Sequence, residues 1–160
     1  MLKTKVNSIN TIHSGITNKN SDDILKSFPE FINFLKTDYK VEYEPFIITA
    51  DIMYSLLNLC SHKSKEISDY ATSVCKQLIS TINEHSIKRI LPVLLDFSSS
   101  LKWKTSLTRL ILLDDLAKAA PLTVSRNLNT IIPVVSDMMW DSKPQVKARA
   151  SKTMTSLCNT

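Results

Sequence analysis

Residues 129–158, NTIIPVVSDMMWDSKPQVKARASKTMTSLC, say the most about the fold. The first half is an apolar run that contains a proline. The second half places Val146, Ala150 and Leu157 at helical spacing. Between the halves, SKPQ at 142–145 combines a capping box with a first-turn proline, which signals the start of a helix. This stretch therefore predicts two helices joined by a short turn.

The same pattern recurs along the chain with a fixed period. Residues 65–78 overlay residues 144–157 at an offset of 79 positions, with alanine and leucine at matching places. Residues 104–111 form a middle copy about 40 residues from each neighbour. The helices that precede these copies contain Pro92 and Pro133, which lie 41 residues apart. A proline inside a helix removes one backbone hydrogen bond and bends the helix.

A period of about 40 residues is that of HEAT repeats. We therefore predict an all-α fold, a HEAT-repeat α-solenoid (an alpha-alpha superhelix) of about three to four helix pairs. Pro45 in EPFII is a looser, earlier copy of the proline position. Helices are expected at 22–37, 44–60, 65–83, 86–99, 103–118, 122–139 and 143–158, with a weaker one at 3–14.

The repeats do not extend with equal strength over the whole chain. Residues 41–160 are expected to form the HEAT repeats. Residues 1–40 are expected to be an N-terminal helical segment, partly mobile and a candidate degenerate cap repeat. TDYKVEY at 37–43 is the predicted linker.

Composition excludes several classes of enzyme. Gly15 is the only glycine, whereas the GxxxxGK[ST] and GxGxxG loops each need at least two glycines to bring backbone amides to a phosphate. Three cysteines without a CxxC pair indicate neither a disulfide framework nor a thiolate zinc site. The Asp114-Asp115 pair lacks a partner histidine or a second acidic cluster, so it does not indicate a metal-dependent hydrolase. We expect no catalytic activity, cofactor, metal or small-molecule substrate.

The hydropathy pattern also argues against membrane association. No apolar run approaches the roughly 18 residues of a transmembrane helix. The start of the chain, MLKTKVNSINTIHSG, lacks the apolar core of a signal peptide. These features predict a soluble, cytoplasmic protein with no membrane partner.

The net charge of +5 is unevenly distributed. Residues 1–100 hold 11 basic and 11 acidic side chains, whereas residues 101–160 hold 9 basic and 4 acidic ones. Lysine and arginine neutralise phosphates and release counterions, so the basic segment predicts a phosphate-binding surface. The alternative is a solvated helix surface with an ordinary basic excess. The predicted RNA-binding residues are Lys102, Lys104, Arg109, Lys118, Arg126, Lys143, Lys147, Arg149 and Lys152.

Other candidate functional residues have a structural interpretation that the sequence favours. Trp103 and Trp140 could stack on bases, but an indole at an inter-helix corner more often packs between repeats. Asp141 could act as an acid, but an aspartate at such a turn usually bonds backbone amides or a cation. Cys60, His62 and Cys75 could bind zinc if the turn brought them together, yet Cys75 falls on a predicted core face, which favours a buried thiol.

Several segments together resemble the N-terminal HEAT domain of fungal-type translation elongation factor 3. Residues 129–158 resemble it most, because a Trp-Asp corner, a basic turn and a small-residue helix occur in the family's order. Residues 1–40 match only as generic helices. A related segment occurs in the large ribosome-associated activator of the amino-acid-starvation kinase. The other matching segments are VEYEPFI at 41–47, HKSKEIS at 62–68, IKRILPVLLD at 87–96 and LKWKTSL at 101–107.

This resemblance implies association with the ribosome. The family's elongation factor is a two-cassette ATPase that aids release of deacylated tRNA, and its HEAT domain touches the small subunit and neighbouring RNA. No ATPase, helical-bundle or chromodomain-like segment is recognised in this sequence. We therefore predict a non-catalytic ribosome- or rRNA-binding HEAT module in translation elongation or its regulation. Its partner would be the small subunit, rRNA or a ribosome-bound factor. The alternative is a HEAT protein-protein interaction scaffold that does not bind the ribosome.

Overall fold

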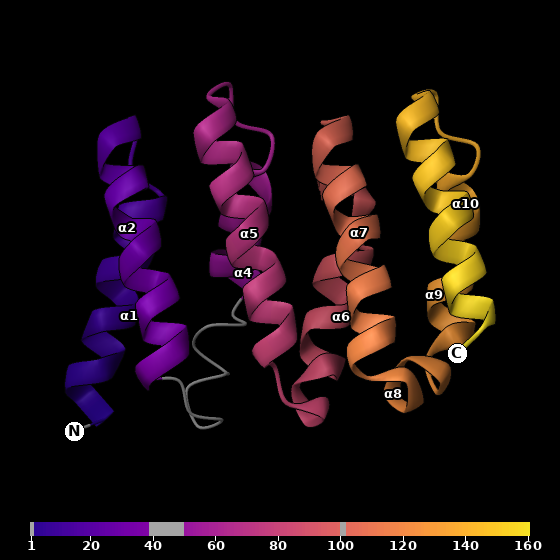
Figure 1. Ribbon diagram of the computed structural model, residues 1–160, viewed down its shortest axis with the longest axis horizontal. Coiled ribbons are helices and arrows are strands. Elements are labelled where there is room, and N and C mark those ends of the chain that lie inside the picture. The colour runs from indigo at the N-terminus through magenta and orange to yellow at the C-terminus, as the bar shows by residue number, and fades with distance from the viewer. Residues whose placement is uncertain (1, 39–49, 100–101) are drawn as a thin grey trace.

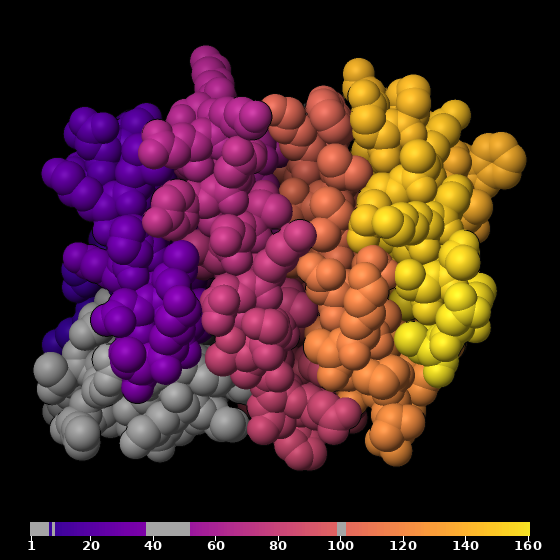
Figure 2. All heavy atoms as spheres, in the orientation of Figure 1, coloured from indigo at the N-terminus to yellow at the C-terminus, as the bar shows by residue number. Residues whose placement is uncertain are grey.

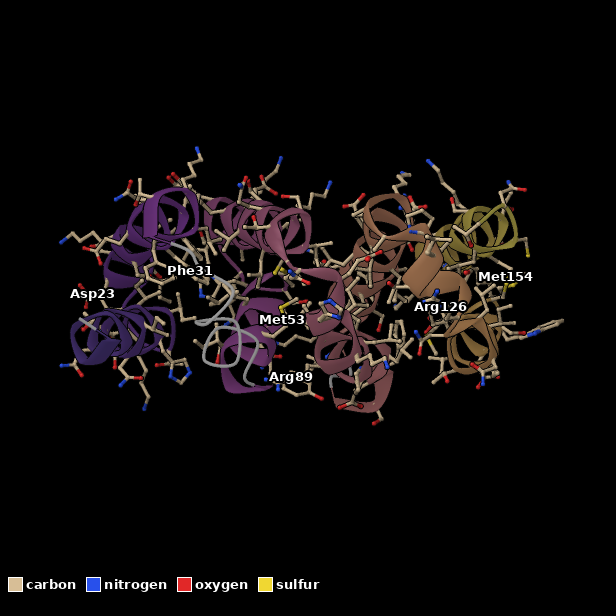
Figure 3. The ribbon with its side chains drawn as sticks, turned by 90° about the horizontal axis from the view of Figure 1, so that it is seen from below. Asp23, Phe31, Met53, Arg89, Arg126 and Met154 are labelled. Atoms are coloured by element: carbon tan, nitrogen blue, oxygen red, sulfur yellow. The ribbon has the colours of Figure 1, made fainter. Side chains whose placement is uncertain are left out.

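The computed structural model describes residues 2–38, 50–99 and 102–160, which form a row of four helix pairs (Figure 1). The first helix of each pair lies in one layer and the second in the other, seen as two rows in Figure 3. The described residues contain no strand, and the predicted all-α solenoid is confirmed. The pairs are α1 (Leu2–Ile16) with α2 (Ser21–Asn33), α4 (Ala50–Leu59) with α5 (Lys65–Thr81), α6 (Ile87–Leu95) with α7 (Trp103–Ala119), and α9 (Leu128–Met138) with α10 (Pro144–Cys158).

The core runs along the row between the two layers. Ala71 of α5 and Ala150 of α10 are fully buried, as are Leu78 and Leu157 at the ends of the same helices. These pairs were matched by the repeat period, so the overlay of residues 65–78 on 144–157 is confirmed. The second helices also pack on one another in order, α2 on α5, α5 on α7 and α7 on α10. Each pair is therefore stabilised mainly by its neighbours.

Short helical turns divide two of the predicted helices. The helix expected at 86–99 consists of the 3-10 turn η3 (Glu84–Ser86), α6 and the 3-10 turn η4 (Phe97–Ser99). The helix expected at 122–139 is split into α8 (Pro121–Ser125) and α9. Asn127 lies at this break, where its Nδ2 donates to the carbonyl of Thr123 at 2.7 Å. Such a side-chain bond competes with the helical backbone pattern, which explains the interruption.

Prolines occur inside the first helices, as the sequence predicted. Pro92 lies within α6 and Pro133 within α9, and both rings are exposed. Pro29 lies within α2, so a proline also occurs inside one of the second helices. An exposed proline leaves the buried face of a helix intact while removing one hydrogen bond on the solvent side.

The N-terminal pair is formed by the segment with the weakest sequence signal. The weaker helix expected at 3–14 is present as α1, which buries Ile9, Ile12 and Ile16. α1 packs on α2 and also contacts α4. Beyond α2 the chain continues as the π-helical turn η1 (Phe34–Asp38). The linker predicted at 37–43 falls largely outside the described residues, as does the predicted proline match at position 45.

The lone glycine belongs to this first interface rather than to a turn. Gly15 lies inside α1, and a Cβ atom placed on it would come within 2.7 Å of Ser27 Cβ on α2. Real Cβ atoms do not approach so closely. Glycine is therefore required here for the close contact between the two helices.

No helix among the described residues is both long and apolar enough to span a lipid bilayer.

Candidate nucleic-acid interface

The second helices all run in the same direction, so their N-termini lie along one edge of the molecule, at the top of Figure 1. An exposed helix N-terminus presents unpaired N–H groups and a partial positive charge. The N-cap residues of α5, α7 and α10 are Ser64, Lys102 and Lys143, and none of them makes a side-chain capping hydrogen bond. By contrast, the N-cap side chain of α2 accepts a bond from the backbone N–H of Asp22.

The start of α10 differs from the prediction in one respect. Pro144 occupies the first turn as expected, but the N-cap is Lys143, so the capping box predicted at 142–145 is not what begins the helix. Instead, Asp141 Oδ1 accepts a hydrogen bond from the backbone N–H of Lys143 at 2.8 Å. This confirms the structural interpretation of Asp141 as a turn residue.

Six lysines lie at or next to these helix starts. We call this row of lysines the N-terminal edge, and all six side chains are exposed. The first turns of α7 and α10 contain no acidic residue, although that of α5 contains Glu66. Figure 2 shows the second helices side by side on this face of the molecule, with the starts of α5, α7 and α10 toward its upper margin. The members of the N-terminal edge are Lys63, Lys65, Lys102, Lys104, Lys143 and Lys147.

Sequence reasoning missed two of these lysines. Lys63 and Lys65 precede or begin α5, in the half of the chain where basic and acidic residues balance. The net charge of residues 1–100 is zero, so a count over this whole segment did not reveal the two lysines. The repeat period contained the missing signal, since Lys63 and Lys65 match Lys102 and Lys104 at an offset of 39 residues. Charge counted at equivalent positions of these two repeats would have found both lysines.

A groove opens on the N-terminal edge between α5 and α7. Its volume is about 390 Å³, and Trp103, Lys65 and Lys104 are among its lining residues. Lys104 Nζ lies 6.0 Å from the centroid of the Trp103 ring. Trp103 is half-buried and packs against the core, so its predicted packing role is confirmed. Trp103 also lines the groove, together with Asp69 and residues with hydroxyl groups such as Thr72.

Arg109 was predicted to bind phosphate, and this prediction is wrong. Its side chain is only 1% exposed, donates to the carbonyl of Val93, and lies with its guanidinium 5.5 Å from the centroid of the Tyr54 ring. Burial lowers the pKa of Arg109, while the nearby Tyr54 and Asp96 groups oppose that shift. Tyr54 in turn donates to Asp96 Oδ2 at 2.7 Å, a bond that raises the pKa of Tyr54. Arg109 therefore links helix pairs in the interior.

Arg149 is also engaged within the protein. Its Nη2 lies 2.7 Å from Asp114 Oδ2 on α7, and its side chain is 18% exposed. Lys118 Nζ lies 3.0 Å from the same oxygen, with most of its side chain in solvent. Burial would raise the pKa of Asp114, but hydrogen bonds from Ser156 and Lys118 and the charges of Lys118 and Arg149 outweigh it and lower the pKa. Asp114, the first residue of the Asp114-Asp115 pair, is thus a structural carboxylate.

The remaining predicted residues do not lie on the N-terminal edge. Lys118 belongs to the last turn of α7, and Arg126 follows α8 at the opposite end of the helices. Lys152 is exposed in the middle of α10. The nine predicted residues therefore divide into Lys102, Lys104, Lys143 and Lys147 on the edge, three exposed residues elsewhere, and the engaged residues Arg109 and Arg149.

Trp140 does not pack between repeats as predicted, since 84% of it is exposed. The two tryptophans occupy different positions relative to their helices. Trp103 is the first residue of α7, whereas Trp140 lies in the turn before α10 begins at Pro144. At the 40-residue offset, Trp103 corresponds to Lys143 and not to Trp140.

The prediction that Cys75 is a buried thiol is confirmed, because Cys75 is fully buried. A hydrogen bond with the thiol of Cys60, together with burial, raises the pKa of Cys75.

Comparison with known proteins identifies a family for the whole described array. The family model for the EF3 N-terminal HEAT repeat matches residues 2–154. Elongation factor 3 of Phytophthora infestans is 41% identical over 104 residues, covering 64% of this chain and 10% of that protein. Elongation factor 3 of Gonapodya prolifera is 30% identical over 160 residues, covering 99% of this chain and 14% of that protein. The chain thus spans only about a tenth to a seventh of these relatives.

Solved structures support the fold alone. One engineered protein superposes with a TM-score of 0.52 at 13% identity, covering 93% of this chain and 62% of that one. A second engineered protein gives a TM-score of 0.53 at 13% identity, covering 95% and 64%. The family match also extends the similarity to residue 2, whereas the sequence segments suggested that it began near position 41. The chain belongs to the EF3 N-terminal HEAT repeat family.

Proposed function

We propose that this chain is a non-catalytic, cytoplasmic module of the translation machinery that binds the ribosome through ribosomal RNA, at its small subunit. The family relationship supports a role in translation, because the matched relatives carry the name elongation factor 3. The match covers a helical array without a nucleotide-binding loop, which supports a binding role rather than a catalytic one.

The N-terminal edge is the observation that carries the RNA part of the proposal. Three consecutive helix pairs each place exposed lysines beside a helix N-terminus that lacks a side-chain cap. Lysine side chains and free helical N–H groups both favour phosphate oxygens. Because the pairs repeat along one direction, the cations form a row, and a row suits the regularly spaced phosphates of a nucleic-acid strand.

The groove between α5 and α7 supports the same conclusion. Trp103 lines this groove together with Lys63, Lys65 and Lys104, and Asp69 is the one carboxylate in its lining. An aromatic side chain with several cations nearby is a common arrangement for holding an unpaired base with its phosphate, and the cations outnumber the single carboxylate here. We infer that RNA contact is centred on this groove and extends along the N-terminal edge toward Lys143.

Cosedimentation with ribosomal subunits at physiological salt tests the proposal. We compare Lys65→Gln/Lys104→Gln/Lys147→Gln, which alters the edge, with a matched variant that removes the same charge from the same three helices away from it. The control is Lys76→Gln/Lys118→Gln/Lys152→Gln, whose lysines are all exposed.

The edge variant should bind more weakly and flatten the plot of log affinity against log salt by up to about 2 to 3 units, at roughly 0.7 to 0.9 per phosphate contact. The control should retain most of the affinity and slope. Wild-type protein that stays in the supernatant would overturn the ribosome-binding function. Equal losses in both variants would overturn the N-terminal edge as the binding site.

A scaffold function is the second candidate, and a specific feature favours it. A groove with an apolar half lies between α6 and α9, in the layer of first helices. This groove does not include the N-terminal edge, so the two functions are compatible and separately testable.

A further inference from the structure

The first helices leave an open groove between the third and fourth pairs. α6 packs on α7 and α9 packs on α10, while little direct contact joins α6 to α9 in the described structure. Two adjoining cavities of about 560 and 400 Å³ fill this space, and both are lined by Lys88 and Asn127. We call them together the α6–α9 groove. Ligand cavities in proteins are typically about 300 to 1,000 Å³ in volume, so each is large enough to hold several side chains.

One half of the α6–α9 groove is aliphatic. Leu91, Pro92 and Leu95 line it from α6, and Val134 lines it from α9. Leu91 is buried, Leu95 and Val134 are half-buried, and Pro92 is exposed. The proline inside α6 therefore contributes its ring to the groove wall. None of the residues lining this half is aromatic or charged except Lys88 at its end.

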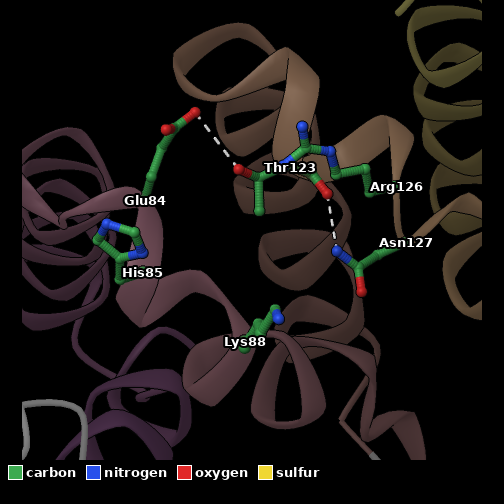
Figure 4. A pocket seen from close by; sticks show the side chains of 6 residues that line it. All are labelled: Glu84, His85, Lys88, Thr123, Arg126 and Asn127. Atoms are coloured by element: carbon green, nitrogen blue, oxygen red, sulfur yellow. Dashed lines mark hydrogen bonds between the residues drawn. The ribbon is translucent and has the colours of Figure 1, made fainter.

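The other half is polar and carries two cations (Figure 4). Glu84 Oε1 accepts a hydrogen bond from Thr123 Oγ1 at 3.3 Å, and Asn127 Nδ2 donates to the Thr123 carbonyl at 2.7 Å. These three residues are thus engaged with one another. Within the described part of the chain, neither Lys88 nor Arg126 has an ion-pair partner, and both are exposed. The polar half therefore offers two cationic donors, with the imidazole of His85 beside them, and retains one carboxylate of its own.

This combination favours a protein segment over RNA. Bases bind preferentially on aromatic side chains, and the apolar half contains none: its wall is mainly aliphatic, with Lys88, Asn127 and Thr130 beside the aliphatic side chains. A strand of RNA would also bring several negative charges close to Glu84, whereas a single carboxylate fits between the two cations. An apolar floor with a cationic end is complementary to a peptide with an aliphatic and an acidic side chain.

We propose that the α6–α9 groove binds a partner protein segment that places an acidic side chain between Lys88 and Arg126 and an aliphatic side chain against Leu91, Leu95 and Val134. The groove sets the spacing of these side chains. Lys88 and Leu95 are seven residues apart on α6, or about 10 Å along a helix. A peptide in the polyproline II conformation has three residues per turn and advances about 3.1 Å per residue. Side chains three residues apart therefore lie on the same face, about 9 Å from each other, which matches this spacing.

Methyl NMR of the full chain, labelled at leucine and valine, tests the proposal with defined peptides. The probe is acetyl-SEAALS-amide, which has glutamate and leucine three residues apart. Two control peptides replace the glutamate by lysine or the leucine by serine. We expect the probe to shift the methyl signals of Leu91, Leu95 and Val134 with a dissociation constant of about 1 mM, and each control peptide to bind about tenfold more weakly.

A charge-reversed protein provides the complementary test. In Lys88→Glu/Arg126→Glu, both changes are on exposed side chains, so thermal melting should be nearly unchanged. This variant should no longer bind the probe measurably, and it should bind the lysine-bearing peptide about tenfold more tightly than the probe. Unchanged methyl signals up to about 10 mM probe, or equal binding of all three peptides, would overturn the proposal. Stronger shifts of the same methyls by a ten-nucleotide oligouridylate would overturn it in favour of RNA. Ribosome cosedimentation of the wild type is independent of these results.

Discussion

Arg149 Nη2 on α10 lies 2.7 Å from Asp114 Oδ2 on α7, so an ion pair joins the last two helix pairs at their interface. The carboxylate is nearly inaccessible, with its side chain 3% exposed. Lys118 contacts the same oxygen from the solvent side. The position equivalent to Arg149 in the preceding repeat is Arg109, which is likewise turned inward. Basic residues at this repeat position hold helix pairs together.

Removing Arg149 should destabilise the protein. Arg149→Ala leaves a buried carboxylate with only Lys118 as its cationic partner, and breaking a buried pair in this way typically costs about 3 to 5 kcal/mol. Because Lys118 remains, we expect the lower end of that range or slightly less in the free energy of unfolding, measured by urea titration. Lys118→Ala should cost less than about 1 kcal/mol, since its side chain is mostly in solvent. Equal losses would contradict the assignment of Arg149 as the principal partner.

The same carboxylate should make stability depend on pH. The pKa of Asp114 is lowered in the folded state from its ordinary value of 3.8. Its contribution is therefore fully present above about pH 4 to 5 and is lost as pH falls through the folded-state pKa. Asp114→Asn should flatten the acid limb of the curve of unfolding free energy against pH. Guanidinium titrations of both proteins between about pH 2 and 6 measure this. Parallel curves over that range would show that Asp114 does not contribute.

Gly15→Ala should lower stability although alanine is the better helix former. Alanine in a helix interior is favoured over glycine by about 1 kcal/mol. The added Cβ would meet Ser27 Cβ at 2.7 Å, however, so α1 must move away from α2. Overpacking of this kind costs about 1 to 3 kcal/mol. Thermal melting should show a net loss.

A second substitution separates the steric effect from helix propensity. Ser27→Gly removes the atom that clashes, so Gly15→Ala introduced into Ser27→Gly should be neutral or stabilising. The sign of the Gly15→Ala effect should therefore reverse between the two backgrounds. If the substitution stabilises the wild type as well, the close contact between α1 and α2 is not limiting.

Tryptophan fluorescence should distinguish the two indoles. In Trp103→Phe, the only remaining indole is Trp140, which is 84% exposed. Its emission should be red-shifted and strongly quenched by acrylamide. In Trp140→Phe, the half-buried Trp103 should emit at shorter wavelength and be quenched less. Similar quenching in the two variants would indicate that Trp140 is covered in solution, for example by a second copy of the chain.

The positions of the helices along the chain could be predicted from the sequence alone. A 40-residue period, helical spacing of apolar residues and the proline before α10 predicted the second helices to within a few residues, because these signals depend on positions close along the chain. The burial of Cys75, Ala71 and Leu157 followed from the same period. The excess of lysine in the last 60 residues was also a property of the sequence.

Only the tertiary structure decided which basic residues and tryptophans are accessible. Arg109 and Lys104 lie five residues apart on α7, yet one is buried among Tyr54 and Val93 and the other is exposed at the helix start. Lys65 and Lys104 come together at one groove although they are 39 positions apart. Accessibility depends on the neighbouring pair that packs on each helix face, and charge counts along the chain do not contain that information. The parallel stacking of α5, α7 and α10 brings their N-termini, and hence their lysines, to one edge.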